Sequence, residues 1–385
     1  MKLIHTSDLH LDMCFRGSGT PASFGNRRRQ SMRDVFHGII ERAGLWPADA
    51  LLIAGDLIEL DRITRDTILF LVSEFESIPD VSVFIAPGNH DPYTPVSPYA
   101  TAPWPENVTI FSKAQWEQHT VCDGRLTVHG FAFDGPTISK NPFGDLQIER
   151  GASDDSIHVA VGHGSERDHQ PPGVEDYAPF SAKDAACDGL RYLALGHFHS
   201  VTEIAGPYDT VVYYSGSPEG HDFREPGTHH YLEVEIDGPE VSVRRVPSSR
   251  SEFAVHTLSC EGSTHTQHMV EAIRRIARQA EVTQIARITL TGPGIPEITG
   301  QMGSIYDAIA EEFEFLDLRD RTDPPEDFTE LEREGTSMGV FVQTINEEIR
   351  DAANDGARQM LVRARTLGVA AFRKRPVEIL GLEQR

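Results

Sequence analysis

Short apolar runs alternate with helical patterns near the N-terminus, and this alternation constrains the fold more than any other feature of the sequence. The apolar runs at residues 2–6, 50–53 and 81–86 have the length of buried strands. Residues 26–43 and 64–75 place apolar side chains at helical spacing, and each pattern begins with a residue type, Asn or Thr, that caps helices. This order of elements predicts a layered α/β domain.

Further apolar runs follow at closer spacing as far as about residue 250. They lie at residues 126–131, 157–161, 192–195 and 211–214. Closely spaced strands are typical of hairpins, so we expect these strands to form a second, more antiparallel sheet. The segment VPSSRSE, at residues 246–252, has the composition of a linker.

The pattern restarts beyond this segment. Strands are predicted at residues 253–258, 285–291 and 314–319, with helices at 268–280 and 304–312 between them. This order predicts a small α/β module.

Three parts are therefore expected along the chain. They are a main domain at residues 1–250, a small α/β domain at 253–320 and a charged helical region at 328–385. The segment RTDPPED, at residues 321–327, has the Pro and Asp content of a hinge between the last two parts.

The overall composition restricts the class of protein. The formal net charge is −24, whereas nucleic-acid-binding proteins usually carry a basic patch. Net charge alone does not exclude such a ligand, because local patches determine binding. The four cysteines are far apart, which is typical of free thiols in a reducing compartment. No apolar run is long enough to cross a bilayer and no signal peptide is evident, so we expect a cytoplasmic protein without membrane contact.

Metal-ligand side chains follow five of the predicted strands. One such motif is weak, because Asp and His are common in turns, but five at strand ends indicate one metal centre. The residues are Asp8 and His10 in TSDLH, Asp56 in AGDLI, Asn89, His90 and Asp91 in GNHD, His163 in VGHGS, and His197 and His199 in LGHFHS.

The ligand types indicate the metal and the reaction. Imidazoles and carboxylates without a thiolate suit Mn²⁺, Fe²⁺ or Zn²⁺. Three carboxylates or amides and four imidazoles, with a fifth imidazole to spare, make seven ligands. Seven are too many for one ion and suit two, which in two-metal hydrolases lie about 3.5–4 Å apart and activate a bridging water. The sequence therefore predicts hydrolysis of phosphate esters.

The set D-x-H, G-D, G-N-H-D, G-H and G-H-x-H, spanning residues 8–199, resembles the calcineurin-like metallophosphoesterase superfamily. The resemblance implies a layered α/β/β/α sandwich that binds two divalent ions, of which Mn²⁺ is expected. It assigns the ligands by position: Asp8, His10 and His199 for the first ion, Asn89, His163 and His197 for the second, and Asp56 between them.

The same resemblance gives roles to the other residues of these motifs. His90 would face the substrate and stabilise the pentacoordinate phosphorus or protonate the leaving oxygen, and Glu59 would orient it. Asp91 either accepts a hydrogen bond from a metal-binding imidazole or is a turn carboxylate before Pro92. The sequence GDLIELD lacks the Arg of G-D-x-x-D-R-G, which argues against a protein phosphatase.

Two segments resemble one branch of the superfamily, the bacterial SbcD-type DNA-repair nucleases and especially the YhaO-like group. They are IHTSDLHLD and the segment YYSGSPEGHDFREPGTHHYLEVEI at residues 213–236. The small α/β domain matches the capping domain of that branch in position. The resemblance implies exonucleolytic or endonucleolytic cleavage of DNA, an SbcC-type ABC ATPase partner and a homodimer. A helix at 340–353 would either dock on the ATPase or pack on its own domain.

Arginines close to the first motif are candidates for contacts with the DNA backbone. They are Arg16, Arg27, Arg28 and Arg29. The last three would otherwise be the solvated first turn of a helix. Two other functions remain open: a small-molecule phosphodiesterase or phosphatase of the same superfamily, and a scaffold with a degenerate site, against which the complete ligand set argues.

Overall fold

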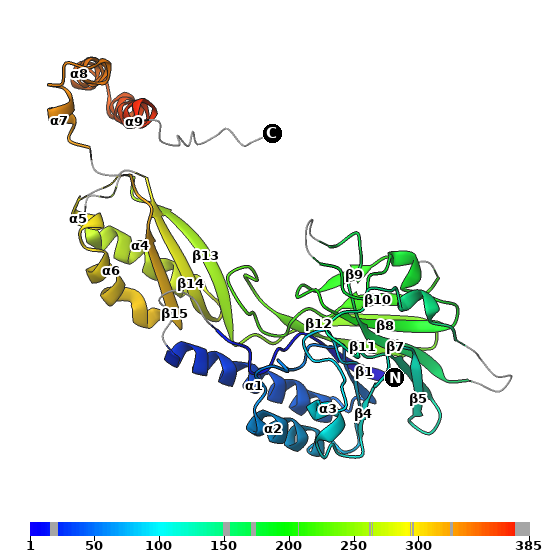
Figure 1. The fold of residues 1–385 in the computed structure, drawn as a ribbon. Coiled ribbons are helices and arrows are strands. Elements are labelled where there is room, and N and C mark those ends of the chain that lie inside the picture. The colour runs from blue at the N-terminus through cyan, green and yellow to red at the C-terminus, as the bar shows by residue number, and fades with distance from the viewer. Residues whose placement is uncertain are drawn as a thin grey trace. The chain divides into compact units, whose positions relative to one another are not determined.

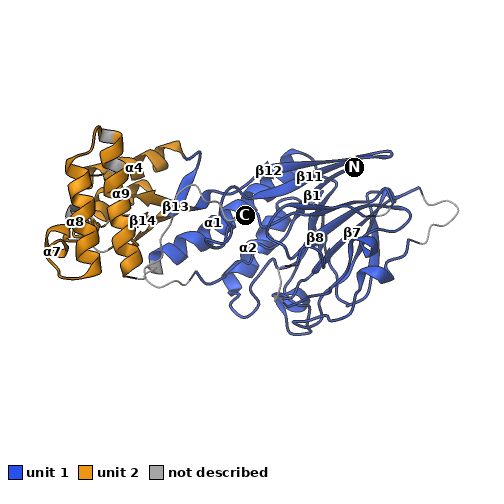
Figure 2. Ribbon diagram, turned by 90° about the horizontal axis from the view of Figure 1, so that it is seen from above, with its two compact units in different colours: residues 1–254, 280–286 blue, residues 255–279, 287–385 orange. Residues whose placement is uncertain are grey.

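A computed structural model describes most of the chain, and two compact units emerge from its contacts. The described residues are 1–15, 22–148, 155–170, 175–206, 208–261, 263, 265–292, 294, 296–323 and 326–373. The first unit comprises residues 1–254 and 280–286, and the second comprises residues 255–279 and 287–385 (Figure 2). Each unit is considered by itself.

The first unit contains a six-stranded sheet whose centre is parallel (Figure 1). Strands β1, β2, β3 and β4 run parallel to one another, and β11 and β12 add to the β1 edge in antiparallel pairing. The strands, in sheet order, are β12 (Glu240–Pro247), β11 (His230–Asp237), β1 (Lys2–Thr6), β2 (Ala50–Ile53), β3 (Ser82–Ile85) and β4 (Val108–Ile110).

A second six-stranded sheet follows, and the expectation that it would be more antiparallel is wrong. Its four central strands are parallel, and only the two edge strands pair antiparallel. The long connections within it cross over rather than turn back, which strand spacing did not indicate. In sheet order the strands are β5 (Glu117–Val121), β6 (Leu126–Gly130), β7 (Ile157–His163), β8 (Leu190–Gly196), β10 (Val211–Tyr214) and β9 (Thr202–Ile204).

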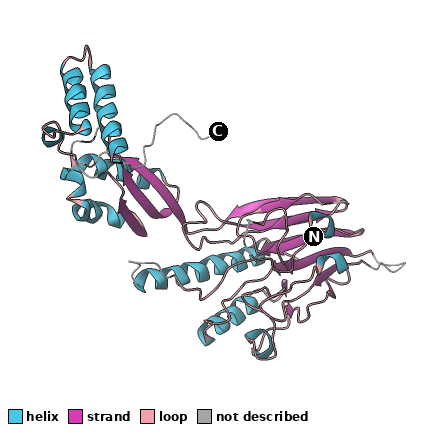
Figure 3. Cartoon of the chain, turned by 45° about the horizontal axis from the view of Figure 1, so that its top comes forward, coloured by secondary structure: helices cyan, strands magenta, loops and turns pink. Residues whose placement is uncertain are grey.

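The two sheets and two long helices form layers, as the α/β expectation required (Figure 3). Helices α1 (Ala22–Leu45) and α2 (Arg65–Glu76) pack on one face of the first sheet, where Phe36 and Phe75 share a core with Leu51 and Ile53. Alternate residues such as Leu52 point to the other face and pack against the second sheet.

The outer face of the second sheet is covered differently. Its core contains Phe131, Phe143, Phe180 and Leu193. Among the described residues, loops and the short 3₁₀ turns η1 (Phe143–Asp145) and η2 (Ala182–Asp184) contribute to this layer. The single-turn helix α3 (Pro98–Thr101) lies in the connection between β3 and β4.

The starts of the two long helices test the sequence prediction of their caps. The Thr64 cap is confirmed, because its hydroxyl accepts a hydrogen bond from the backbone N–H of Thr67 at the start of α2. The Asn26 cap is wrong, because α1 begins at Ala22 and buries Phe24 before reaching that residue. Asn26 instead accepts a hydrogen bond from Arg29 within the helix.

The second unit is built around a three-stranded sheet in the order β13–β14–β15, whose first two strands extend into it from residues of the first unit. The predicted linker at 246–252 holds the end of β12 and the start of β13. The elements are β13 (Ser251–Ser259), α4 (Thr266–Gln279), β14 (Thr283–Thr291), α5 (Pro296–Thr299), α6 (Met302–Ile309), η3 (Ala310–Glu312) and β15 (Phe315–Asp320).

Among its described residues, the second unit also contains the helices α7 (Phe328–Leu331), α8 (Ser337–Arg350) and α9 (Asp355–Phe372). Val342 and Val369 form a small core between the last two, and Phe341 packs against the ring of Phe372. Phe341 therefore packs on its own unit. No helix in the described ranges combines the length and the apolar character that crossing a membrane requires.

The DNA-backbone role expected for Arg28 is wrong. Its side chain is fully buried and its Nη1 lies 2.6 Å from Oε1 of Glu219. Its Nη2 also donates to the carbonyl of Gly220 at 2.8 Å. The helical spacing of α1 turns Arg28 inward, whereas Arg27 is exposed and Arg29 is half-buried. Arg16 lies outside the described residues.

We predict that Arg28→Ala lowers the free energy of unfolding by about 3–5 kcal/mol, because it leaves the Glu219 carboxylate buried without its partner. Urea unfolding followed by circular dichroism measures the change. The neighbouring exposed variant Arg27→Ala is the control, with an expected loss below about 1 kcal/mol. Equal losses for the two variants would contradict the buried-pair account.

Candidate metal centre

The predicted strand-end residues come from both sheets and meet in one place. Within the part of the chain that the structure describes, four overlapping groups of side chains have ligand atoms within 4.8 Å of one another, close enough to hold a metal ion. The groups are Asp8, His10 and His199; His10, Asp56 and His90; Asp8, Asp56 and His163; and His199, His221 and Glu225. The carboxyl ends of parallel strands thus supply most of the members, as the sequence predicted.

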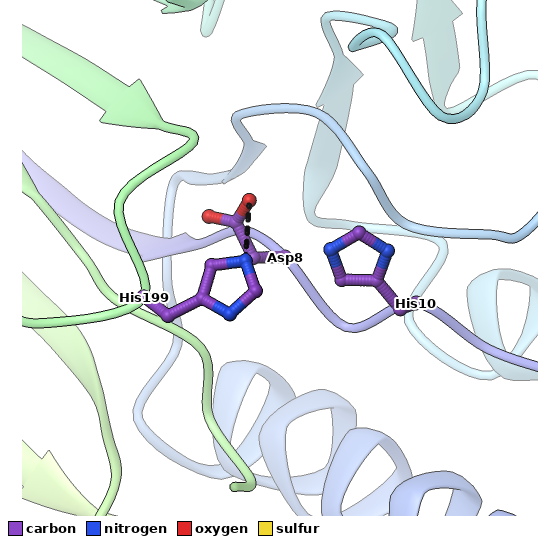
Figure 4. Close-up of side chains that lie close together, drawn as sticks. All are labelled: Asp8, His10 and His199. Carbon is purple, nitrogen blue, oxygen red and sulfur yellow. Dashed lines mark ion pairs between the residues drawn. The ribbon is translucent and has the colours of Figure 1, made fainter. Parts of the chain in front are cut away.

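The first group joins the loop after β1 to the loop after β8 (Figure 4). His199 Nε2 lies 3.8 Å from Oδ1 of Asp8, and the ring of His10 lies 5.3 Å from that of His199. Asp8 is fully buried and also accepts backbone hydrogen bonds from His197. These three side chains therefore surround one position with two imidazoles and a carboxylate.

Asp56 lies between this group and the next. Its Oδ2 is 3.8 Å from His10 Nε2 and 3.3 Å from His163 Nε2. Its other oxygen, Oδ1, accepts the backbone N–H of His90 at 2.9 Å. A single buried carboxylate therefore faces imidazoles from both groups, which is the arrangement of a ligand shared by two ions.

The candidate position for a second ion is centred on His163. Its Nδ1 lies 2.9 Å from the carbonyl of Ala54, which fixes the proton there, because a carbonyl oxygen only accepts. Its Nε2 lies 3.0 Å from Oδ1 of Asn89 and 3.3 Å from Oδ2 of Asp56. The ring of His197 packs at 5.2 Å from that of His163. In the neutral imidazole the Nε2 lone pair would face two acceptor oxygens, a conflict that a proton or a bound metal cation at this position would relieve.

An unpaired atom in the first group also fits a cation. His10 Nδ1 lies 2.7 Å from Oε1 of Glu59, which places the proton on Nδ1 and the lone pair on Nε2. Among the described residues, His10 Nε2 is buried and has no hydrogen-bond partner. Buried polar atoms are rarely left unsatisfied, and a bound metal ion would satisfy this atom. The position beside Asp8, His10 and His199 and the position beside His163 together fit two divalent ions.

The backbone at the site is strained. Four candidate ligands have positive φ angles, a conformation that non-glycine residues rarely adopt and that clusters at functional sites. They are Asp8 at 53°, His10 at 47°, Asp56 at 50° and His197 at 113°.

The glycines of the motifs explain part of their spacing. A Cβ on Gly55 would lie 2.4 Å from Nδ1 of His163, and a Cβ on Gly196 would lie 1.9 Å from the carbonyl oxygen of Ala54. Neither position accepts a side chain. The G-D and G-H motifs therefore bring strand ends close enough for their side chains to share ions.

His90 is the most exposed of these side chains, with 47% of its side chain accessible to solvent. Its Nδ1 lies 3.1 Å from Oε1 of Glu59, the same oxygen that accepts from His10. The hydrogen bond to Glu59 raises the pKa of His90 to about 9. Glu59 thus contacts His90 as expected, and it also contacts the candidate ligand His10, which the sequence did not indicate.

The role of Asp91 is structural. It is fully buried and accepts backbone N–H groups of Asp56 at 3.1 Å and Leu57 at 2.7 Å, and the hydroxyl of Tyr99 at 2.6 Å. None of these contacts is the expected hydrogen bond from a metal-binding imidazole. Asp91 instead holds the turn that carries Asp56.

Two residues at the site were missed by the sequence analysis. Glu225 Oε1 lies 2.6 Å from Nδ1 of His199, and His221 Nδ1 lies 3.2 Å from Glu225 Oε2. Both come from the long connection between β10 and β11, not from a strand end. The segment that resembles the YhaO-like group contains both residues, but no predicted strand ends directly before either, and a strand end was the signal that marked the other candidates.

The charges at the site favour bound cations. Burial opposes charge on Asp56, but His163 and the other imidazoles hold the pKa of its carboxyl well below the usual range. Burial likewise opposes charge on His163, but the Asp56 carboxylate raises its pKa to about 9, and Glu225 and Asp8 do the same for His199. Burial lowers the pKa of His197 to about 4. Buried carboxylates thus attract positive charge to this position.

The layered sheets and the clustered carboxylates and imidazoles define a metal-dependent hydrolase. A model of the calcineurin-like phosphoesterase family matches residues 1–201, more than half of the chain. The chain belongs to the calcineurin-like phosphoesterase family. The resemblance stated from the five motifs is therefore confirmed.

Two curated relatives agree with the branch that the sequence resembles. The chain is 29% identical over 252 residues to the uncharacterized metallophosphoesterase YhaO of Bacillus subtilis strain 168, covering 63% of this chain and 59% of YhaO. It is 23% identical over 246 residues to the DNA double-strand break repair protein Mre11 of Methanopyrus kandleri, covering 58% of this chain and 50% of Mre11. The matches thus span less than two thirds of either relative.

A solved structure has a more distant likeness. The crystal structure of a dimetal phosphatase from Danio rerio matches 64% of this chain and 96% of its own, at 8% identity and a TM-score of 0.41. This likeness is too low to carry an argument.

We predict that the metal-free protein loses stability as the pH rises from about 6.5 to about 9. The pKa values of His163 and His199 rise from 6.5 to about 9 in the folded state. Their contribution to the free energy of unfolding is therefore complete below pH 6.5 and is lost as the pH rises through 9. Melting temperatures measured after chelation should fall across this range.

The metal-loaded protein is the control, because bound ions replace these protons and should remove the pH dependence. A metal-free protein whose melting temperature stays level from pH 6.5 to 9 would contradict the assigned proton binding.

Proposed function

We propose that the chain is a two-metal phosphodiesterase that hydrolyses DNA phosphodiester bonds, as an exonuclease or endonuclease subunit in DNA repair. The observation that carries the proposal is the Glu59–His90 pair beside the carboxylate of Asp56 that both groups share. The relative named as a double-strand break repair protein supports the choice of DNA as substrate.

We assign the ligands as the motifs and the distances suggest. Asp8, His10 and His199 would hold one ion, and Asn89, His163 and His197 would hold the other, with Asp56 contacting both. Mn²⁺ is the proposed metal, because mixed oxygen and imidazole ligands without a thiolate suit it. Two bound ions supply Lewis-acid polarisation of the phosphoryl group and an activated water.

His90 is assigned as the general acid. Its pKa of about 9 keeps the imidazole protonated at neutral pH, so it can donate a proton to the leaving oxygen. Glu59 holds the ring by its Nδ1, and the exposed side chain leaves the other nitrogen within reach of a bound phosphodiester. Proton donation is thus assigned to His90, and orientation of its ring to Glu59.

DNA would be held by basic groups near the site. Arg27 is exposed and Arg29 is half-buried on α1, and both are proposed to contact the DNA backbone. Arg16 belongs to the same proposal but lies outside the described residues. The net charge of −24 makes weak binding by this chain alone the expected result.

An SbcC-type ABC ATPase is the proposed partner that supplies the remaining DNA contacts. Its proposed docking segment is the helix pair α8–α9, which exposes Val340 and Met360 to 61% and 72%. A homodimer is proposed for the nuclease itself, and the cytoplasm as its location.

The second candidate function is a small-molecule phosphodiesterase or phosphatase. The strongly negative net charge favours it, because a polyanionic substrate is repelled by an acidic surface. Both functions use the same ions and the same His90, so only the substrate distinguishes them.

We predict that His90→Gln lowers turnover by about 10²–10⁴-fold, the usual contribution of a general acid, while metal content stays unchanged. Asp56→Asn should also lose metal, because it removes the shared carboxylate. Metal content measured by mass spectrometry beside the initial rates separates these effects. His37→Gln, an exposed histidine on α1, should change neither quantity. Near-normal turnover in His90→Gln would contradict the acid role.

Nuclease activity of the purified chain with Mn²⁺ tests the substrate. End-labelled linear duplex and single-stranded DNA are compared with bis-p-nitrophenyl phosphate and cyclic nucleotides. Metal-dependent loss of DNA ends that His90→Gln abolishes is the expected result. Turnover of the small diesters with intact DNA, also in the presence of a cognate ATPase, would favour the second candidate.

A further inference from the structure

His221 is a buried histidine whose role neither the motifs nor the family match assigns. It lies in the connection between β10 and β11, and only 5% of its surface is exposed. Among the described residues, its Nε2 is buried and has no hydrogen-bond partner. An unpaired buried nitrogen costs free energy unless a ligand satisfies it.

The other nitrogen of His221 identifies which atom carries the proton. His221 Nδ1 lies 3.2 Å from Oε2 of Glu225, and its backbone N–H donates to the same oxygen at 3.0 Å. A proton on Nδ1 is attracted by this carboxylate, whereas a lone pair there would be repelled by it. The proton therefore lies on Nδ1, and Nε2 carries a lone pair.

The carboxylate of Glu225 contacts the Nδ1 atoms of two histidines. Its Oε1 lies 2.6 Å from Nδ1 of His199, so His199 also keeps its proton on Nδ1. The two Nδ1 atoms are also within hydrogen-bond distance of each other, at 3.1 Å, so a proton on Nδ1 of both rings requires that each points to Glu225 and not to the neighbouring ring. In metal sites such a carboxylate commonly fixes the imidazole so that the opposite nitrogen binds the ion. In His199 the opposite nitrogen, Nε2, faces Asp8. In His221 the carboxylate of Glu225 likewise leaves Nε2 as the nitrogen able to bind an ion.

The ring of His221 lies beside the first candidate metal position. Its centroid is 4.8 Å from that of His199 and 5.1 Å from that of His10, with interplanar angles of 76° and 87°. Both neighbours are proposed ligands of the first ion. Three imidazoles therefore stand together on this side of the site.

The backbone around His221 is held by buried contacts. Arg28 pairs with Glu219 at 2.6 Å and donates to the carbonyl of Gly220 at 2.8 Å. Glu219 also accepts the backbone N–H of Arg250 at 2.8 Å. The segment is thus positioned before any ligand binds, as metal sites require.

We propose that Nε2 of His221 is a further ligand of the first ion, which extends the donor set of Asp8, His10, Asp56 and His199 by a third imidazole. The proposal rests on the two-metal site of the proposed function, but not on the choice of DNA as substrate. An additional imidazole favours ions such as Zn²⁺ and Fe²⁺ at this position relative to ions that prefer oxygen.

Nuclear magnetic resonance of the protein labelled with ¹⁵N-histidine tests the proposal directly. Long-range ¹H–¹⁵N correlations are recorded before and after two equivalents of Zn²⁺, and the His221 signals are assigned with His221→Gln. The Nε2 resonances of His10, His199 and His221 should shift together. Shifts at His10 and His199 alone would overturn the proposal, and no shift at any of the three would overturn the two-metal site with it.

Calorimetric titration with Zn²⁺ gives a second readout that needs no substrate. His221→Gln should weaken binding of one of the two ions at least tenfold, comparable to the loss of a residue that supports a ligand, and leave the other ion unaffected. Asp222→Asn, whose side chain pairs with Arg224 in the same segment, is the matched control and should bind both ions normally. Normal binding of both ions by His221→Gln, with an unchanged melting temperature, would overturn the proposal.

Discussion

The buried carboxylate of Asp56 is the constraint on which the rest of the site depends. A carboxylate without water must be balanced by positive charge or by several hydrogen bonds. Asp56 is 2% exposed and faces the imidazoles of His10 and His163 from opposite groups. The raised pKa of His163 lets a proton on that ring balance the carboxylate in the metal-free protein, and two bound cations would do so in the metal-loaded protein. The fold thus holds a buried negative charge in place, and bound cations would balance that charge.

Much of the surrounding structure serves to hold that carboxylate. Asp91 accepts the backbone N–H groups of Asp56 and Leu57, and Gly55 lets the turn approach His163. The positive φ angle of Asp56 is a strained conformation that these contacts maintain. Glu225 acts in a similar way, because its contact with Nδ1 fixes the orientation of the His199 ring. Ligand orientation in this protein is thus determined by carboxylates that do not themselves belong to the predicted ligand set.

The sequence located the candidate ligands at strand ends because each of them comes directly after an apolar run that can be recognised locally. Asp8, Asn89 and His163 each follow a short apolar run, and parallel strands bring their ends together. The sequence could not predict burial created by distant residues. The local sequence predicts a surface position for Arg28, and only the distant residue Glu219 explains its burial. His221 does not follow a strand end, so no local signal indicated its position at the site. The direction of the strands in the second sheet was missed because crossover connections and hairpins can have similar spacing.

Anomalous X-ray diffraction from crystals grown with Mn²⁺ tests the central claim most directly, because it locates the ions without reference to any substrate. The account predicts two anomalous peaks about 3.5–4 Å apart on either side of the Asp56 carboxylate. One peak should lie beside Asp8 and His199, and the other beside Asn89 and His163. A single peak at saturating Mn²⁺, or two peaks that do not share Asp56, would contradict the account.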